Sequence, residues 1–399
     1  MTIDRGRNSQ INKQHNRGLV LKLVATAQCR IRAELARQTG LTKMAVTNIV
    51  SELIDLDLLV ESVIEPDEYL RKNSIALQIS PKAPKIIGVL IFRDRFEAVL
   101  CDLSLNIIRR ERINIEQLTR DLLIQTIFTL IDAVLSFEPD ILGIGIASIG
   151  PIDKQAGIIL EPRYFYNIKN VEIVDILKSR YGMPVFLDHD NQCGALAEML
   201  YGYGKGFRDF ILLGLSRGIG SGIVIDGKLQ FNNQGLAPEI GHVSIDYQGL
   251  ECVCGNRGCI EMYAASPVIR DCLRKATGLN LSFRDFCLFE DDERIDAVFI
   301  DVIQKLAVAL ISSVNLLNPE LILLGHDSVC FPDKYVSLLE QEINRRKFTS
   351  PSHVVRVRKT YFKEDSQLLG AVCNVAIQAF DGKLLFGAVE ESDLKSKMN

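Results

Sequence analysis

Residues 210–227, FILLGLSRGIGSGIVIDG, decide which class of fold this chain adopts. The uninterrupted apolar run at 210–215 predicts a buried strand, a glycine-rich turn follows it, and a second strand is expected at 222–225. Asp226-Gly227 predicts a hairpin turn, because both residues tolerate the left-handed backbone that such a turn needs. The later elements of this set are a helix at 297–317, a strand at 321–324 and a closing helix near 368–380.

An earlier part of the chain repeats this succession. Its expected elements are strands at 86–92, 96–102 and 107–115, a helix at 119–136, strands at 141–146 and 185–187, and a helix that opens at 194–200. Strand triplets followed by helices, twice over, are typical of two similar α/β domains. We expect ligands of such a pair to bind in the cleft between the domains.

The first 80 residues have a different pattern. Apolar spacing predicts helices at 16–28, 32–38 and 43–53, with Gly40 supplying a tight turn and Thr42 capping the third helix. Helix, glycine turn and helix form the helix-turn-helix pattern, whose last helix enters the major groove of DNA. Two short strands, at 60–63 and 74–79, are joined by a polar link and predict a wing.

The charge distribution supports a nucleic-acid partner for this N-terminal head. Residues 1–50 carry nine Lys/Arg and two Asp/Glu, a formal +7, so the rest of the chain sums to -11 within the net -4. A solvated basic face, or a three-helix module that binds no DNA, is the alternative. The DNA-binding candidates are Arg32, Thr42, Lys43, Met44, Thr47 and Asn48 around the third helix, with Arg71 and Lys72 in the wing.

Composition excludes several other classes. With 399 residues, 47% hydrophobic and 24% charged, the chain is globular and too long for one compact domain, not disordered or fibrous. It has no run of 18 apolar residues and no signal-peptide core, so we expect a cytoplasmic protein without a membrane span. Its ten cysteines are mostly scattered, which suits a reducing compartment.

One cysteine cluster is typical of a metal site. Cys252, Cys254 and Cys259 lie within eight residues, and His242 lies ten positions before them. Three thiolates and one imidazole predict a structural, tetrahedral Zn²⁺ site. The alternatives are a metal-free loop and a redox disulfide. We expect the remaining cysteines to be small buried hydrophobes.

Acidic residues and histidines occur beside this cluster and after a buried strand. Asp190, in the segment Asp188-His189-Asp190, follows the strand and could act as a general base on a hydroxyl. Glu239, His242 and Glu261 flank the cysteines, and such side chains bind vicinal sugar hydroxyls. His242 could bind zinc through one ring nitrogen and sugar through the other. Each residue alone could equally form a surface salt bridge or a helix cap.

These motifs resemble the ROK family (repressor, open reading frame, kinase) over nearly the whole chain. Residues 239–242 match its E-x-G-H motif, 252–261 match C-x-C-G-x-x-G-C-x-E, and 218–222 match its second phosphate loop. The resemblance implies an N-terminal winged helix-turn-helix followed by two actin-like, hexokinase-type (RNase H-like) α/β domains. It also implies zinc bound by His242, Cys252, Cys254 and Cys259, and sugar contacts from Gly150, His189, Asp190, Glu239, His242 and Glu261.

The chain departs from the family's kinases in the first phosphate loop. Where they carry D-x-G-x-T, this sequence has Leu90, Phe92 and Asp94 at the Asp, Gly and Thr positions. Phe92 would block close approach of the backbone to phosphate, and Asp94 would repel it. We therefore expect no kinase activity, with Asp190 as a vestigial base. Arg163 stands near the position where the kinases carry a substrate-binding Asn.

The expected domains are 1–80, then 81–192 with about 372–399, then 193–371 with the zinc loop. The predicted function is a sugar-responsive DNA-binding repressor of a carbohydrate operon. Its expected partners are double-stranded operator DNA, a sugar or sugar-phosphate effector, and further copies of itself in a homodimer or homotetramer. Two alternatives stay open: an active ATP-dependent sugar kinase with a DNA-binding head, and a repressor controlled by a protein partner.

Overall fold

The computed structural model describes residues 9–63, 75–138, 140–231, 236–289, 291–350 and 352–386. Two compact units divide the chain. The first unit comprises Met1–Ile146, Ile173–Phe186 and Val372–Asn399, and the second comprises Ala147–Glu172 and Leu187–Ala371. A finer division of the first unit at residue 80 stays a prediction.

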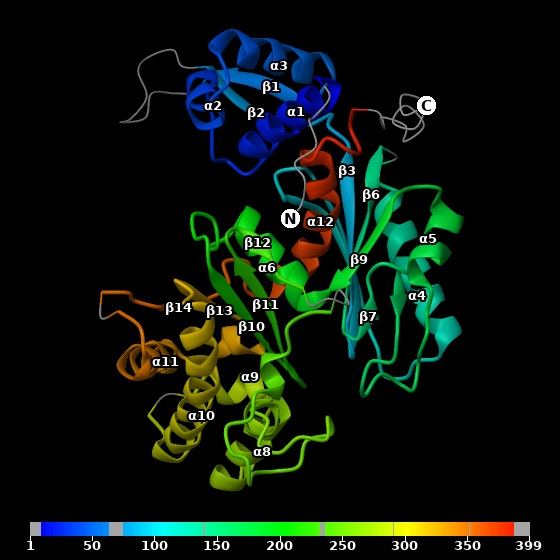
Figure 1. The fold of residues 1–399 in the computed structure, drawn as a ribbon. Coiled ribbons are helices and arrows are strands. Elements are labelled where there is room, and N and C mark those ends of the chain that lie inside the picture. The colour runs from blue at the N-terminus through cyan, green and yellow to red at the C-terminus, as the bar shows by residue number, and fades with distance from the viewer. Residues whose placement is uncertain are drawn as a thin grey trace, which may run out of the picture. The chain divides into compact units, whose positions relative to one another are not determined.

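The first unit begins with three helices and a two-stranded antiparallel sheet (blue in Figure 1). The elements are α1 (Ser9–Ala25), α2 (Arg32–Thr39), α3 (Lys43–Asp55), β1 (Leu59–Val63) and β2 (Ile75–Ile79). Gly40 ends α2 in the left-handed conformation, and the Thr42 hydroxyl accepts a hydrogen bond from Ala45 N at 3.2 Å, so the predicted turn and cap are present. Helix α1 starts seven residues before the predicted 16–28, because its first turns are polar and lack apolar periodicity.

The sheet of the first α/β half has the order β5-β4-β3-β6-β9. Its strands are β3 (Lys85–Ile91), β4 (Arg95–Cys101), β5 (Ile107–Asn114), β6 (Ile141–Ser148) and β9 (Val185–His189), with helices α4 (Arg120–Leu135) and α5 (Ile173–Tyr181). Strands β3, β4 and β5 are neighbours in the sheet, as the strand triplet predicts, and they pair antiparallel. A small hairpin of β7 (Ile152–Asp153) and β8 (Ile158–Ile159) follows β6.

The second unit contains a sheet of order β12-β11-β10-β13-β14. Its strands are β10 (Phe210–Leu215), β11 (Ile219–Ile225), β12 (Lys228–Leu229), β13 (Leu321–His326) and β14 (Arg356–Lys359). Strand β10 pairs antiparallel with β11 and parallel with β13. The helices of this unit are α6 (Asp190–Leu200), α7 (Glu261–Ala264), α8 (Ser266–Thr277), α9 (Phe283–Phe286), α10 (Glu293–Leu317) and α11 (Asp333–Arg346). Helix α12 (Ser366–Phe380) begins in this unit and ends in the first. A mainly helical head is followed along the chain by two α/β halves, which confirms the predicted fold class.

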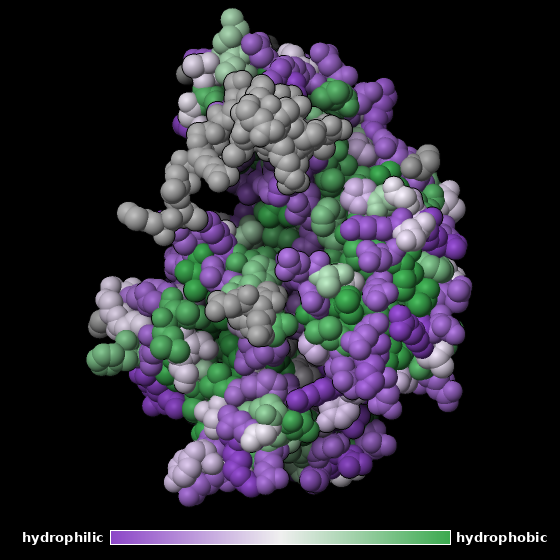
Figure 2. Space-filling view, turned by 45° about the vertical axis from the view of Figure 1, so that its right-hand side comes forward, coloured by the Kyte–Doolittle hydropathy of each residue, from purple (hydrophilic) through white to green (hydrophobic). Residues whose placement is uncertain are grey.

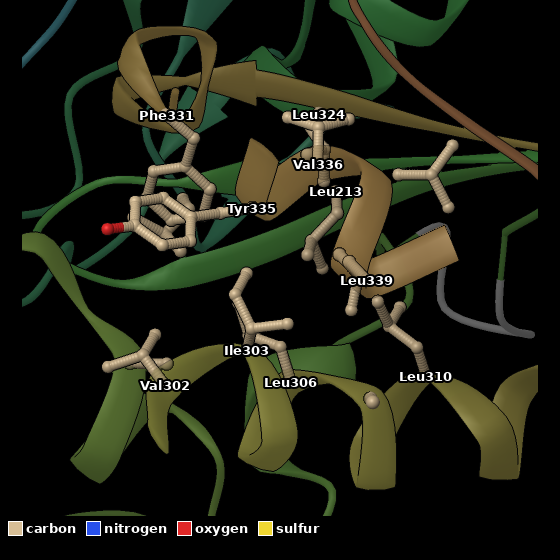
Figure 3. Close-up of a cluster of buried hydrophobic side chains, with 14 of the residues drawn as sticks. Leu213, Val302, Ile303, Leu306, Leu310, Leu324, Phe331, Tyr335, Val336 and Leu339 are labelled. Carbon is tan, nitrogen blue, oxygen red and sulfur yellow. The ribbon is translucent and has the colours of Figure 1, made fainter. Parts of the chain in front are cut away.

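A continuous apolar core lies between this sheet and its helices. In Figure 3, Leu213 of β10 and Leu324 of β13 point toward side chains from α10 and α11. The rings of Phe299 and Tyr335 stack with centroids 4.6 Å apart. Figure 2 shows hydrophilic residues across much of one face, with smaller hydrophobic patches among them.

Helix α10 is long and apolar enough to cross a membrane by length and composition alone. However, 50% of its most apolar window is buried inside the protein, and one of its faces belongs to the core just described. That burial is what a core helix of an α/β domain shows.

The glycine-rich stretch after β10 is largely strand, not turn. Strand β11 begins at Ile219, three residues before the predicted start, and therefore includes Gly220 and Gly222. A Cβ atom on Gly220 would lie 2.5 Å from Asn191 Nδ2, and one on Gly222 would lie 2.6 Å from Ala195 Cβ. These glycines let α6 pack closely against the strand, a constraint that the spacing of glycines alone does not reveal.

Candidate metal centre and effector site

The cysteine loop folds back on itself around four candidate metal ligands. Cys252 N donates to Asn256 O at 2.8 Å, and Gly255 N donates to Cys252 O at 2.9 Å. Gly255 and Gly258 have φ values of 91° and 71°, which favour glycine. These turns bring together residues that are up to seventeen positions apart in the sequence.

The four predicted ligands converge. The ligand atoms of His242, Cys252, Cys254 and Cys259 all lie within 4.8 Å of one another. The Cys254 and Cys259 Sγ atoms are 3.7 Å apart, and Cys252 Sγ is 3.6 Å from His242 Nδ1. A tetrahedral ion with bonds of about 2.3 Å to sulfur and about 2.0 Å to nitrogen needs separations of about 3.8 Å and about 3.5 Å. The cluster therefore fits a metal ion.

The other cysteines divide into two groups. Cys29, Cys101, Cys193, Cys287 and Cys373 are buried, whereas Cys272 is exposed and Cys330 is half-buried. The expectation that all the remaining cysteines are small buried hydrophobes is therefore wrong for these last two. Cys272 lies on the outer face of the amphipathic helix α8.

Asp190 is the centre of a second polar cluster. It is the first residue of α6, where the helix dipole favours a negative charge. Its Oδ1 lies 3.0 Å from His189 Nδ1 and accepts from Asn191 N at 2.7 Å. Its Oδ2 lies 3.3 Å from Nε2 of His326, the last residue of β13. A buried carboxylate is thus held between two imidazoles.

The two imidazoles control the ionisation of Asp190. Burial alone would raise the pKa of Asp190, but His189 and His326 outweigh it and hold that pKa below its usual range. Burial alone would lower the pKa of His189, but Asp190 outweighs it, and Glu239 and Asp188 add to the rise. The site therefore favours an ionised carboxylate beside a protonated His189.

The pKa of Glu239 is shifted in the opposite direction to that of Asp190. Burial raises its pKa. The imidazoles of His189 and His242 oppose this rise. The carboxylates of Glu261 and Asp190 add to it. The predicted acidic and histidine residues are thus close enough to influence one another.

Two further predicted residues support the shape of the cluster. A Cβ atom on Gly150 would lie 2.5 Å from His189 Cδ2, so only glycine admits the imidazole in this position. Glu261 Oε2 accepts a hydrogen bond from Ile219 N at 2.9 Å, which links α7 to the start of β11. All six predicted effector residues (Gly150, His189, Asp190, Glu239, His242 and Glu261) belong to the second unit.

Sequence reasoning missed two charged neighbours of this cluster. His326 could have been suspected as a polar residue at the carboxyl end of a predicted buried strand, where α/β ligand sites gather. Lys154 ion-pairs with the buried Asp188 and lies 4.4 Å from the centre of the Phe231 ring. Lys154 follows the short strand β7, for which the sequence has no clear signal.

The Arg163 side chain forms a hydrogen bond with the cysteine loop. Its Nη2 donates to Val253 O at 3.2 Å, so it connects the 160–170 segment to the cysteine loop. Arg163, near the position of the kinases' substrate-binding Asn, thus contacts the cysteine loop.

The DNA-binding candidates occupy the N-terminal end of α3. Thr42, Lys43, Met44, Thr47 and Asn48 are all exposed, and Met44 keeps 71% of its surface accessible. Arg32 instead forms an ion pair with Glu61 of β1. Arg71 and Lys72 of the predicted wing lie outside the described residues.

The β3–β4 turn contains Phe92 and Asp94, two of the residues that the sequence predicts to replace the first phosphate loop of the family's kinases. The Phe92 side chain is buried, and the Arg95 guanidinium lies 5.0 Å from the centre of its ring. Arg95 also pairs with Asp94 at 3.4 Å and with Glu97 at 2.8 Å. The Phe92 ring and the ion pairs of Arg95 thus occupy this turn.

Similarity to solved structures shows which fold class the chain adopts. The fold is that of bacterial sugar kinases, with a TM-score of 0.65 to a ROK family glucokinase from Streptomyces griseus at 20% identity. That match covers 72% of this chain and 98% of the kinase. The ROK family model matches residues 86–377, and the chain therefore belongs to the ROK family.

Full-length similarity extends to repressors. The chain is 27% identical over 389 residues to the xylose repressor of Caldicellulosiruptor bescii, covering 92% of this chain and 97% of that repressor. It is 25% identical to the DNA-binding transcriptional repressor Mlc of Escherichia coli, covering 94% and 95% of the two chains. A solved ROK family transcriptional regulator, described as a homologue of E. coli Mlc, matches with a TM-score of 0.79 and 26% identity over 94% of this chain and 98% of its own.

Proposed function

We propose that this protein is a sugar-responsive DNA-binding transcriptional repressor of a carbohydrate operon. The observation that carries the proposal is the capped, exposed N-terminal end of α3 on a chain that matches repressors over their whole length. Kinase structures of the same fold match only 72–74% of this chain. The head is thus an addition that the repressor relatives share.

The head would bind DNA through α3. Thr47 and Asn48 can hydrogen-bond to base edges, and Lys43 can reach phosphate or guanine. In a homodimer or homotetramer in the cytoplasm, two such helices would contact half-sites about 34 Å apart, or a multiple of that distance. Arg32 would have to leave Glu61 before it could contact DNA.

The second unit would bind the effector. Asp190, Glu239 and His242 offer acceptors and donors suited to vicinal hydroxyls. A structural Zn²⁺ held by His242 and the three cysteines would fix the cysteine loop, leaving Nε2 of His242 for the ligand because Nδ1 faces the metal. Several relatives are named for xylose, so D-xylose is the first sugar to test.

The proposed effector domain is not a kinase. Phosphoryl transfer needs a loop that approaches the phosphates closely and neutralises their charge. Here Phe92 and Arg95 fill the β3–β4 turn, and Asp94 adds negative charge. Asp190 is already engaged by two imidazoles. An ATP-coupled assay with D-xylose, D-glucose and N-acetyl-D-glucosamine should detect no phosphorylation; turnover that disappears in Asp190→Asn would instead establish the kinase alternative.

DNA binding is tested directly with fragments from upstream of the protein's own gene. Fluorescence anisotropy should show sequence-selective binding that weakens steeply with salt. Asn48→Ala should reduce selectivity about 10-fold, since one good base contact contributes about 1–3 kcal/mol. Lys275→Ala, an exposed lysine on α8, is the matched control. Binding without sequence selectivity, or without salt dependence, would refute the proposal.

The effector is tested by adding each sugar to the DNA complex. A change in DNA affinity of about 5–150-fold corresponds to the usual range of allosteric coupling. If no sugar changes either the affinity or the melting temperature, a protein partner becomes the better candidate effector.

A further inference from the structure

His326 has an unusual backbone for a residue with a side chain. Its φ and ψ are 54° and -133°, a combination that is costly for L-residues other than glycine. It ends β13, directly after Gly325, and pairs in parallel register with Leu215 at the end of β10. Glycine would remove the strain at this position, so the side chain itself needs an explanation.

The surroundings make room for the imidazole. It is buried, and a Cβ atom on Gly214 of the neighbouring strand would lie 2.7 Å from His326 Cδ2. A Cβ atom on Gly214 would also overlap Asn191 Oδ1, so this glycine leaves room for both the Asn191 amide and the His326 ring. Such strained residues persist where the rest of the structure holds them, and they are concentrated at functional sites.

The ring reaches Asp190 from the side opposite His189. His326 Nε2 lies 3.3 Å from Oδ2, while His189 Nδ1 lies 3.0 Å from Oδ1. The two histidines come from different elements, one preceding α6 and one ending β13. Asn191 N and Nδ2 also donate to Oδ1, so Oδ1 has several partners, whereas His326 is the imidazole that faces Oδ2.

We infer that His326 is a positioning residue of the effector site, which holds Asp190 in the orientation that accepts a hydrogen bond from a ligand hydroxyl. This inference rests on the proposed sugar-binding function. A ring that merely neutralised a buried acid would affect stability, whereas a positioning residue affects affinity for the ligand. The ligand class is an aldose or a related polyol, because a carboxylate that faces two imidazoles at a helix N-terminus can accept a hydrogen bond from a hydroxyl.

Two substitutions separate these roles. His326→Gly relieves the backbone strain but removes the donor, whereas His326→Gln retains an amide donor near the position of Nε2. We expect His326→Gly to bind D-xylose, or whichever sugar of the panel binds the wild type, at least 10-fold more weakly by calorimetry, with a melting temperature that falls little. His326→Gln should recover most of this loss. A folded His326→Gly protein with wild-type affinity overturns the inference.

The proposed function can fail separately. If no sugar of the panel binds the wild-type protein, the sugar effector is refuted, and the contact itself is then tested by thermal unfolding of His326→Gly, Asp190→Asn and the double variant. Non-additive changes in melting temperature support the positioning of Asp190 by His326. Additive changes overturn it.

Discussion

The pKa values of two carboxyl groups in the candidate effector site, the buried Asp190 and the more exposed Glu239, are shifted in opposite directions because their neighbours differ. Asp190 lies between two imidazoles at a helix N-terminus, and its pKa is held low. Desolvation raises the pKa of Glu239, and the imidazoles of His189 and His242 oppose this rise without cancelling it. Pairs of acids tuned apart in this way are typical of binding and catalytic sites, where charge is placed for a ligand at some cost to stability.

Glu239→Gln should therefore stabilise the protein only slightly at pH 7, by less than about 1 kcal/mol, because the Glu239 side chain is exposed and water screens its charge. A raised pKa in the folded state means that stability is lost as pH rises from the unfolded pKa of about 4.3 through the folded value. The difference between variant and wild type should thus be absent at low pH and fully developed above the folded pKa. Thermal unfolding from pH 4 to pH 8 measures it, with the exposed Glu172→Gln as control. A Glu239→Gln protein that is less stable at pH 7 would contradict this account.

Helix α6 packs closely against strand β11 because the strand has glycines at the contact. Gly222 admits the helix, because a Cβ atom there would lie 2.5 Å from Asn191 O. The same helix presents Asp190 at its first turn. The glycines of β11 therefore help to place the effector site.

Gly222→Ala should destabilise the second unit by about 1–3 kcal/mol, the cost of overpacking a close contact. Gly325→Ala is the matched control on the same sheet, because its Cβ would meet Gln367 Nε2 at an ordinary 3.4 Å. Urea unfolding of both variants distinguishes them. Equal stabilities would show that α6 moves away at no cost.

Helix α12 belongs to both units at the scale of the whole molecule. It starts at Ser366 in the second unit and ends at Phe380 in the first. A Cβ atom on Gly370 would overlap the Cys193 carbonyl of α6, and one on Gly18 would overlap the Phe380 carbonyl. One continuous helix thus contacts α6 near its start and α1 of the head at its end.

Gly18→Ala should weaken the coupling between effector and DNA, because α1 must move away from the end of α12. We expect the sugar-dependent change in DNA affinity to fall to less than about 2-fold, from the about 5–150-fold usual for allostery. Lys275→Ala, at an exposed position on α8, should leave the coupling intact. Anisotropy titrations with and without sugar provide the measurement, and unchanged coupling in a folded Gly18→Ala protein would exclude this route.

Metal removal tests how the cysteine loop serves the effector site. Cys254→Ala should lower the metal content well below one ion per chain and abolish the sugar response, because His242 and Glu239 lose their support. DNA binding in the absence of sugar should persist, since the head has its own core. Elemental analysis and DNA titration check both parts. A normal sugar response in a metal-free protein would separate the loop from the site.

Local sequence determined the head, the order of the α/β elements and the four candidate metal ligands. Apolar periodicity, the Gly40 turn, the Thr42 cap and the cysteine spacing act over a few residues, so they can be recognised without a structure. Only the tertiary structure showed that His326 lies beside Asp190 and that Arg32 pairs with Glu61. It also showed that the glycines of β11 allow α6 to pack closely. Those contacts join segments far apart in the chain, and their geometry depends on how strands pair and helices pack, which no local pattern records.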